Sequence, residues 1–170
     1  MRYFNGFCFK DEESIFDEYI NSSLYCVAGF SYGAIKAVEY LKDHKSRVDK
    51  LQLFSPAYFQ NKSDKYKEFQ LKLFSDDKES YIKKFLKNCS YPSKIKLDSF
   101  KSDGTKDELH ELLYYRYDKD ILKSFVKRGI KIEVYLGEKD KIVDFDSSFS
   151  FFKEFATIYK FRNRGHILDG

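Results

Sequence analysis

The sequence predicts an α/β protein in which about five mostly parallel strands form one sheet and a block of helices is inserted near the middle. Three observations indicate this class. A strand, helix, strand pattern occurs at both ends of the chain, the apolar run at residues 24–28 lacks alternation, and residues 61–128 show helical periodicity. Apolar runs without alternation are typical of strands buried on both faces of a parallel sheet. Strands that alternate with helices build such sheets.

The N-terminal part of the chain alternates between strand-like and helical patterns. We expect, in order, a strand at 2–4, a helix at 11–19, a strand at 24–28, a helix at 32–42 and a strand at 51–54. Turn-forming residues end the three strands, namely Asn5-Gly6, Gly29 and Ser55-Pro56. Acidic residues at the start of the 11–19 segment suit the N-terminal end of a helix dipole and support a helix there.

The middle and the C-terminal part of the chain differ in pattern. Apolar residues recur at helical spacing in four segments, 66–73, 81–89, 109–113 and 121–125, and a polar, extended stretch runs from 91 to 106. Strand-like patterning returns at 130–136 and 156–161, with an amphipathic helix over 145–155 between them. We therefore expect the helical insert, residues 61–128, to form a cap over one end of the sheet, within a single domain that spans 1–170.

The composition fits one globular domain and excludes several classes of protein. The chain has 170 residues, of which 42% are hydrophobic and 34% charged, and this is too apolar for a disordered protein. Its net charge of +4 is too balanced for a non-specific nucleic-acid binder. No apolar run approaches the roughly 18 residues of a membrane span, and the N-terminus lacks a signal-peptide pattern, so we expect a cytoplasmic protein with no membrane partner. The three cysteines, Cys8, Cys26 and Cys89, form no metal-binding pattern.

The strongest local motif is Gly29-Phe30-Ser31-Tyr32-Gly33, which lies between a predicted strand and a predicted helix. This context is typical of a nucleophile elbow, in which a sharp turn holds a serine in a strained conformation at the end of a strand. Small residues on both sides let the strand and the helix approach closely. The following helix N-terminus directs N–H groups and its dipole toward developing negative charge. We therefore interpret Ser31 as a catalytic nucleophile rather than an ordinary helix N-cap.

Candidate partners for Ser31 follow in the order acid, then histidine. Asp140 comes directly after the predicted strand at 130–136, and His166 follows the last predicted strand. Because the carboxyl ends of parallel strands meet at one edge of a sheet, the three side chains can converge there. Asp144, four residues beyond Asp140, is the alternative acid, and its simpler interpretation is a loop or cap residue.

These motifs resemble those of the α/β-hydrolase superfamily: the elbow at 29–33, the Gly137-x-x-Asp140-x-x-Val143 segment after a strand, and Gly165-His166 near the end. The short chain narrows the resemblance, as do three further stretches, at 1–9, 29–37 and 53–56. Together they are similar to the compact pimeloyl-[acyl-carrier protein] methyl ester esterases of biotin synthesis. The resemblance implies a minimal α/β-hydrolase fold and covers nearly the whole chain, with the middle matching least.

The chain departs from the superfamily pattern in two ways. The usual N-terminal antiparallel hairpin is missing, and a single helix separates the first strand from the nucleophile strand, so one central strand is deleted and about five remain. Asn5-Gly6 also stands where His-Gly is usual before the oxyanion loop. The resemblance implies that the backbone N–H of Phe7 is one oxyanion donor, paired with the N–H of Tyr32, the residue after the nucleophile.

The resemblance implies a serine carboxylic ester hydrolase that cleaves the methyl ester of a pimeloyl chain on acyl carrier protein and releases methanol. In this reaction Ser31 attacks, His166 accepts its proton and Asp140 orients the histidine, so neither a metal nor an organic cofactor is needed. A general short-chain carboxylesterase or an acyl thioesterase would use the same triad. A non-catalytic binding module is the other alternative, and the complete triad argues against it.

The basic residues indicate where an acyl carrier protein would bind. The whole positive excess of the chain lies within residues 60–130, in the insert expected to overhang the site. Arg116, Lys119, Lys123 and Lys127 recur at three- to four-residue spacing, so one helix would present them as a stripe. Because acyl carrier proteins are acidic, this basic stripe would steer one toward the crevice. A solvated helix face is the alternative interpretation.

Other reactive side chains have simpler interpretations. Cys8 lies beside the expected oxyanion loop but has no adjacent base in the sequence, so we expect it to line a pocket. His44 and His110 lie on charged helical faces, where we expect them to be solvated. Four aromatic residues could line an acyl pocket, although core packing is the default for the many aromatic residues of this chain: Phe30, Tyr32, Tyr58 and Phe59.

Overall fold

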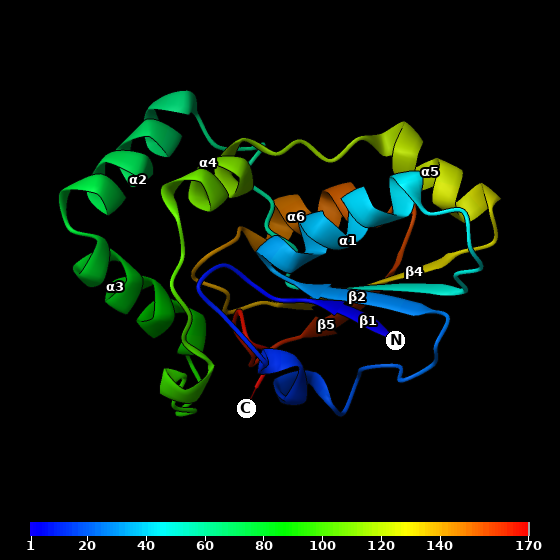
Figure 1. Cartoon of the computed structure of the whole chain (residues 1–170), viewed down its shortest axis with the longest axis horizontal. Coiled ribbons are helices and arrows are strands. Elements are labelled where there is room, and N and C mark those ends of the chain that lie inside the picture. The colour runs from blue at the N-terminus through cyan, green and yellow to red at the C-terminus, as the bar shows by residue number, and fades with distance from the viewer. Residues whose placement is uncertain (170) are drawn as a thin grey trace.

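Residues 1–169, which the computed structural model describes, form a five-stranded sheet in which all strands are parallel. The strands follow chain order across the sheet, which lies at the centre of the molecule in Figure 1. Their bounds are Arg2–Phe4 (β1), Cys26–Phe30 (β2), Lys50–Phe54 (β3), Lys131–Gly137 (β4) and Thr157–Phe161 (β5). The predicted fold class is confirmed, and this arrangement brings all five carboxyl ends to one edge of the sheet.

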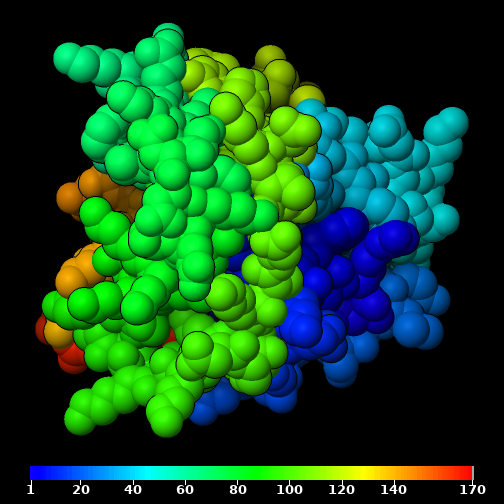
Figure 2. Space-filling view, turned by 60° about the vertical axis from the view of Figure 1, so that its left-hand side comes forward, coloured from blue at the N-terminus to red at the C-terminus, as the bar shows by residue number. Residues whose placement is uncertain are grey.

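Three helices, here called the cap, lie over the carboxyl ends of the strands. They are α2 (Asp64–Asp76), α3 (Lys78–Ser90) and α4 (Lys106–Tyr114), and α2 packs against the other two. The extended stretch between α3 and α4 contains a short 3₁₀ helix, η2 (Asp98–Phe100). Figure 2 shows the side chains of the cap, in green, spread over this end of the molecule.

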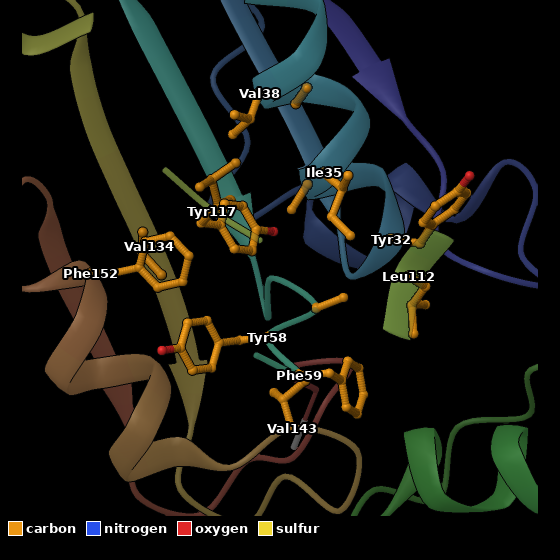
Figure 3. Packing of buried hydrophobic residues seen from close by; sticks show 14 of the residues in the cluster. Tyr32, Ile35, Val38, Tyr58, Phe59, Leu112, Tyr117, Val134, Val143 and Phe152 are labelled. Carbon is orange, nitrogen blue, oxygen red and sulfur yellow. The ribbon is translucent and has the colours of Figure 1, made fainter. Parts of the chain in front are cut away.

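A second group of helices covers one face of the sheet. It consists of α1 (Tyr32–Asp43), α5 (Lys119–Lys127) and α6 (Phe145–Phe152). Leu53 and Val134 of the central strands are fully buried beneath these helices, together with Leu122 of α5 and Phe152 of α6. Figure 3 shows this apolar layer between α1, α6 and the sheet. None of the helices described in residues 1–169 is long and apolar enough to cross a membrane.

The opposite face of the sheet is covered by far less structure. A five-residue 3₁₀ helix, η1 (Glu12–Phe16), lies there, and its Phe16 stacks on Phe54 with 4.6 Å between ring centroids. The β1–β2 and β2–β3 connections step in the same direction across the sheet, but η1 and α1 lie on opposite faces. The two connections therefore have opposite hands, and one of them departs from the right-handed rule for parallel crossovers.

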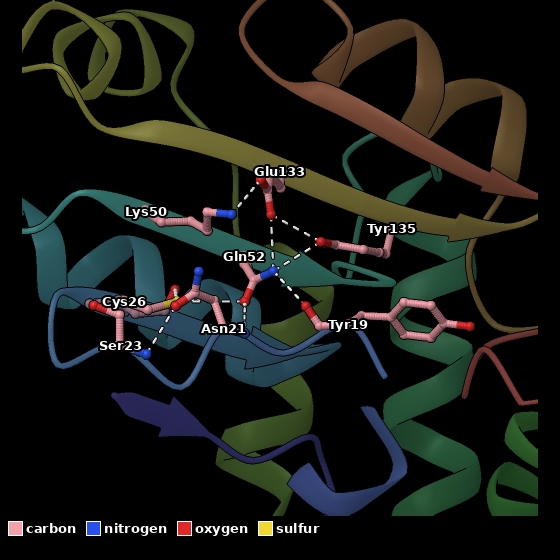
Figure 4. Close-up of polar contacts among 9 residues, drawn as sticks. Tyr19, Asn21, Ser23, Cys26, Lys50, Gln52, Glu133 and Tyr135 are labelled. Carbon is pink, nitrogen blue, oxygen red and sulfur yellow. Dashed lines mark hydrogen bonds and ion pairs between the residues drawn. The ribbon is translucent and has the colours of Figure 1, made fainter. Parts of the chain in front are cut away.

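A row of polar side chains continues this second face where η1 does not reach. Gln52 and Glu133 lie side by side on β3 and β4, and the Gln52 amide donates to Glu133 Oε2 at 2.9 Å (Figure 4). Lys50 forms an ion pair with Glu133 at 2.7 Å, and the Tyr135 hydroxyl donates to the same carboxylate at 2.9 Å. Because these groups satisfy one another, the face tolerates partial contact with water without a covering helix.

Three elements differ from their predicted bounds by more than one residue. β2 begins at Cys26 rather than residue 24, since Leu24 is 86% exposed in a turn before the strand. It also continues through Gly29 to Phe30. The segment predicted as a helix over 11–19 is only the 3₁₀ helix η1, and α6 ends at Phe152 rather than residue 155.

The contact between Phe16 and Phe54 can be tested by deletion. Replacing Phe16 by Ala should lower the free energy of unfolding by about 3–5 kcal/mol, because a buried aromatic ring is lost with no other element to fill the space. The matched change Phe69→Ala, at a side chain that is 55% exposed, should cost less than about 0.5 kcal/mol. Urea unfolding followed by circular dichroism measures both values. Equal losses would mean that η1 does not anchor this face.

Candidate active site

Ser31 occupies a sharp turn between the end of β2 and the start of α1. Its backbone has φ 52° and ψ −111°, a conformation that non-glycine residues rarely adopt. The turn is possible because Gly29 and Gly33 pack without side chains: a Cβ on Gly29 would lie 2.2 Å from the Gly33 carbonyl oxygen, and one on Gly33 would lie 1.9 Å from that of Phe4. The structure thus has the geometry of a nucleophile elbow at this motif.

Hydrogen bonds to β3 and to the segment that follows it hold the strained residue in place. The Ser31 N–H donates to the carbonyl of Phe54 at 2.8 Å, which extends the β2–β3 pairing by one residue. The N–H of Ala57 donates back to the Ser31 carbonyl at 3.1 Å. Strain of this kind persists only where the surroundings fix the backbone on both sides, and here they do.

The structure brings Ser31, His166 and Asp140 into one hydrogen-bonded chain. Nε2 of His166 lies 2.9 Å from Ser31 Oγ, and Nδ1 lies 2.7 Å from Asp140 Oδ2. The Asp140 side chain is 2% exposed, and that of His166 is fully buried. The other carboxyl oxygen of Asp140 accepts the N–H groups of Ile142 and Val143, at 2.7 and 3.1 Å. These two bonds fix the carboxyl group, so it can fix the imidazole.

The alternative acid, Asp144, has a different environment. It lies at the N-cap of α6, where its side chain accepts the N–H of Ser147 at 2.8 Å. This contact holds the pKa of the Asp144 carboxyl below its ordinary value, and it leaves His166 to Asp140. The structure therefore places Asp140 on the histidine and Asp144 in a helix cap.

Two further contacts at the site escaped the sequence interpretation. The Ser55 hydroxyl donates to the backbone carbonyl of His166 at 2.6 Å and so anchors the loop that carries the imidazole. The Tyr32 hydroxyl donates to Glu111 of α4 at 2.5 Å, and Lys36 pairs with the same carboxylate at 2.7 Å. The second contact links the cap directly to the first turn after Ser31. No sequence motif marks either contact, because both join residues far apart in the chain.

The loop that carries Phe7 lies against the elbow. It follows β1 directly, and the Asn5 carbonyl oxygen would be only 2.7 Å from a Cβ on Gly33. Phe7 and Tyr32 are both buried, and within residues 1–169 neither backbone N–H donates a hydrogen bond. Unpaired N–H groups are costly in a buried setting, so these two are available to an anionic oxygen.

The other reactive side chains lie outside this chain of hydrogen bonds. Cys8 is buried, and burial raises the pKa of its thiol to about 12, so the thiol stays protonated at neutral pH. His44 stacks on Tyr40 at the end of α1, and His110 stacks on Tyr114 of α4. In the described part of the chain, no three His, Cys, Asp or Glu side chains are grouped so that they could hold a metal ion.

A cavity of about 240 Å³ lies between the cap and the core. Most of its lining is apolar and comes from all three cap helices, with Phe7 and Phe59 supplied by the core. Lys84 of α3 and Lys141, next to Asp140, are its basic residues. Of the residues named above for the site, Phe7 lines this cavity, and Lys141 and Ile142 of its lining directly follow Asp140 in the chain.

The basic stripe on α5 is not where the sequence placed it. We expected Arg116, Lys119, Lys123 and Lys127 to overhang the site, but α5 lies on the sheet, buries Leu122 and Phe125, and runs away from the cap (Figure 1). Arg128, just beyond α5, donates to the carbonyl of His44 at the far end of α1. The apolar face of α5 packs into the core, and the pattern of charged residues alone does not reveal this. Lys119 is paired with Glu154 at 2.6 Å.

No protein-family model matches the chain, and no curated protein matches it. Solved structures do share its fold. The esterase EaEST from Exiguobacterium antarcticum superimposes with a TM-score of 0.62 at 20% identity, over 83% of this chain and 59% of its own. MenH from S. aureus does so with a TM-score of 0.61 at 12% identity, over 98% of this chain and 87% of its own.

A bromoperoxidase from Bacillus anthracis is similar as well, with a TM-score of 0.65 at 17% identity over 84% of this chain. This chain spans 59% of the length of the Exiguobacterium esterase and 60% of that of the bromoperoxidase. The parallel sheet, the elbow and these likenesses together show that the protein has a minimal α/β-hydrolase fold.

The two acids can be separated by experiment. Asp140→Asn should slow the labelling of Ser31 by a serine-directed fluorophosphonate by up to about 10⁴-fold, because the imidazole loses the partner that sets its tautomer. The matched change Asp144→Asn should leave the labelling rate and the melting temperature nearly unchanged, since Asn caps a helix as well as Asp. Mass spectrometry of the labelled protein gives both rates. The opposite ranking would assign the acid to Asp144.

Proposed function

We propose that this protein is a serine carboxylic ester hydrolase. The observation that carries the proposal is the hydrogen-bonded chain from Ser31 through His166 to Asp140, with the serine backbone held at the elbow. A serine hydroxyl beside an imidazole that a buried carboxylate orients is the arrangement that activates serine for acyl transfer. Carboxylesterases among the proteins of the same fold support this class, including the naproxen esterase from Bacillus subtilis.

The proposed reaction proceeds in two halves. Nδ1–H of His166 donates to ionised Asp140, so Nε2 accepts the proton of Ser31 as its Oγ attacks the ester carbonyl. His166 then gives that proton to the departing alkoxide, and an acyl-serine remains. In the second half, His166 takes a proton from water, the hydroxide attacks the acyl carbon, and the Ser31 oxygen leaves with the proton from His166.

The negative charge that develops on the carbonyl oxygen needs donors in a fixed position. We assign this role to the backbone N–H groups of Phe7 and Tyr32, which are buried beside the elbow with no other partner in the described chain. The N-terminus of α1 adds its dipole in the same direction. Such preorganised donors are commonly the largest electrostatic contribution in acyl transfer.

Within this class, we propose the methyl ester of a pimeloyl chain on acyl carrier protein as the substrate. The resemblance of the elbow and of residues 1–9 supports this choice, and the cavity of about 240 Å³ beside Phe7 is apolar enough for a short acyl chain. A general carboxylesterase or thioesterase would use the same triad. Growth of a biotin auxotroph that lacks its own methyl ester esterase distinguishes these substrates. Rescue of growth by this chain supports the pimeloyl ester. No rescue by a protein that is soluble and hydrolyses other esters favours the general esterase.

The proposed nucleophile can be tested by substitution. Ser31→Ala should reduce the hydrolysis of p-nitrophenyl acetate on the order of 10⁶-fold, because no other group supplies the attacking oxygen. Its melting temperature should stay within a few degrees, since the hydroxyl supports no apolar packing. Ser124→Ala, at an exposed serine of α5, is the matched control and should keep full activity. Activity of the Ser31 variant within tenfold of the parent protein would overturn the proposed nucleophile.

A further prediction concerns the carrier protein. We propose that an acidic carrier approaches the mouth of the cavity, where Lys84 and Lys141 lie, rather than the basic stripe on α5. Lys84→Glu with Lys141→Glu should lower kcat/KM for the carrier-bound ester roughly tenfold at low salt, because rim charges steer association. Hydrolysis of p-nitrophenyl acetate is the internal control for damage to the triad.

The stripe supplies the comparison for this experiment. Reversing Lys119, Lys123 and Lys127 to Glu should change the carrier-bound reaction less than the pair at the cavity does. A larger effect of the triple variant would move the docking surface to α5. Equal losses on both substrates, or none on either, would remove the docking proposal and leave these lysines as solvated surface.

A further inference from the structure

Glu12 is a fully buried acid outside the triad, at the start of η1. Its Oε1 accepts the backbone N–H of Gly6 at 2.7 Å and the Tyr3 hydroxyl at 3.2 Å. Its Oε2 is buried without a hydrogen-bond partner among the described residues. Burial raises the pKa of this carboxyl, whereas the Gly6 N–H acts in the opposite direction. A buried carboxyl group with one unsatisfied oxygen is energetically costly. The hydrogen bond that its other oxygen forms with Gly6 therefore calls for a structural or functional reason.

The partner of Glu12 lies at the start of the turn that carries Phe7. The N–H of Phe9 donates to the Gly6 carbonyl at 3.1 Å, which closes a four-residue turn with Phe7 and Cys8 at its centre. Cys8 has φ 62°, so the turn corresponds to type II, which prefers glycine at that position. The Phe7 N–H belongs to the same peptide plane as the Gly6 carbonyl. The orientation of this plane therefore depends on how Gly6 is held.

The structure holds this turn from two sides. Glu12 binds the N–H of Gly6 on the side of η1. On the other side, the N–H of Ser102 donates to the Cys8 carbonyl at 2.9 Å, and its hydroxyl donates to the Phe9 carbonyl at 3.0 Å. The N–H that Glu12 accepts belongs to the peptide immediately before the Gly6–Phe7 peptide, so a single side chain holds the chain at the point where the turn begins.

We propose that Glu12 is a positioning residue that orients the Phe7 N–H toward the oxyanion through its hydrogen bond to Gly6. This inference rests on the proposed function, since it gives the Phe7 N–H the role of an oxyanion donor. Loss of the acceptor leaves the Gly6 N–H buried without a partner, which is unfavourable, and the turn relieves this by shifting. A displacement of about 1 Å in a catalytic group can cost about 100-fold in rate.

Three substitutions separate reach, charge and volume. Glu12→Gln keeps an oxygen acceptor at the same distance and should retain kcat for p-nitrophenyl acetate within about threefold. Glu12→Asp keeps the carboxyl but shortens its reach by one methylene, and Glu12→Met keeps the volume without the acceptor. Both should lower kcat between about 10- and 100-fold with KM changed less than about threefold, because the lost interaction forms in the transition state. Glu13→Met, at the exposed neighbour, is the matched control and should behave like the parent protein.

The comparison of readouts distinguishes positioning from a purely structural role. Amide hydrogen exchange should be faster at Gly6 and Phe7 in the Asp and Met variants. The first-order rate constant for labelling of Ser31 by the fluorophosphonate should fall in proportion to kcat. If the Met variant does not fold, the Asp variant carries the test. Unchanged kcat in the folded Asp or Met variant, or a Gln variant as slow as Met, would overturn the inference. A parent protein without Ser31-dependent hydrolysis would instead overturn the proposed function.

Discussion

The close approach of β2 to α1 is the constraint on which the rest of the site depends. Gly29 and Gly33 leave no space for a Cβ between the strand, the helix and the end of β1. The chain must therefore turn within one residue, and Ser31 takes up the strain with a positive φ. Because the sheet is parallel, the same edge receives the ends of β4 and β5, from which Asp140 and His166 reach the serine. The triad is thus a consequence of sheet direction together with one tight turn.

The second face of the sheet is only partly covered by other elements. The α-helices cover only the first face, so the residues of the second face must tolerate partial exposure to water. Phe16 of η1 covers Phe30 and Phe54, and beyond it the strands carry Gln52 and Glu133, whose polar groups satisfy one another. In five residues η1 thus supplies both an apolar cover and the carboxyl that binds the turn before Phe7. A longer helix is not needed where the strands carry polar side chains on this face.

Features encoded locally could be predicted from the sequence, and features that depend on distant partners could not. The elbow around Ser31 and the strand ends that precede Asp140 and His166 follow from short motifs and from the geometry of parallel sheets, so their convergence was foreseeable. Glu12 lies among the acidic residues that the sequence shows at the start of a predicted helix, and its burial depends on Gly6 and on Tyr3 of β1. The place of α5 was missed for the same reason, since a lysine stripe says nothing about the apolar face beneath it.

The two halves of the site depend on different parts of the molecule. The contacts of the triad join segments that directly follow β2, β4 and β5, and Ser55, directly after β3, anchors His166. The residues of the turn with Phe7 do not favour its conformation, because Cys8 has a positive φ at a position where such a turn prefers glycine. Its shape comes from η1 on one side and from Ser102, in the stretch between cap helices, on the other. Displacement of that stretch would therefore disturb the Phe7 N–H, the proposed oxyanion donor, before it disturbed the contacts among Ser31, His166 and Asp140.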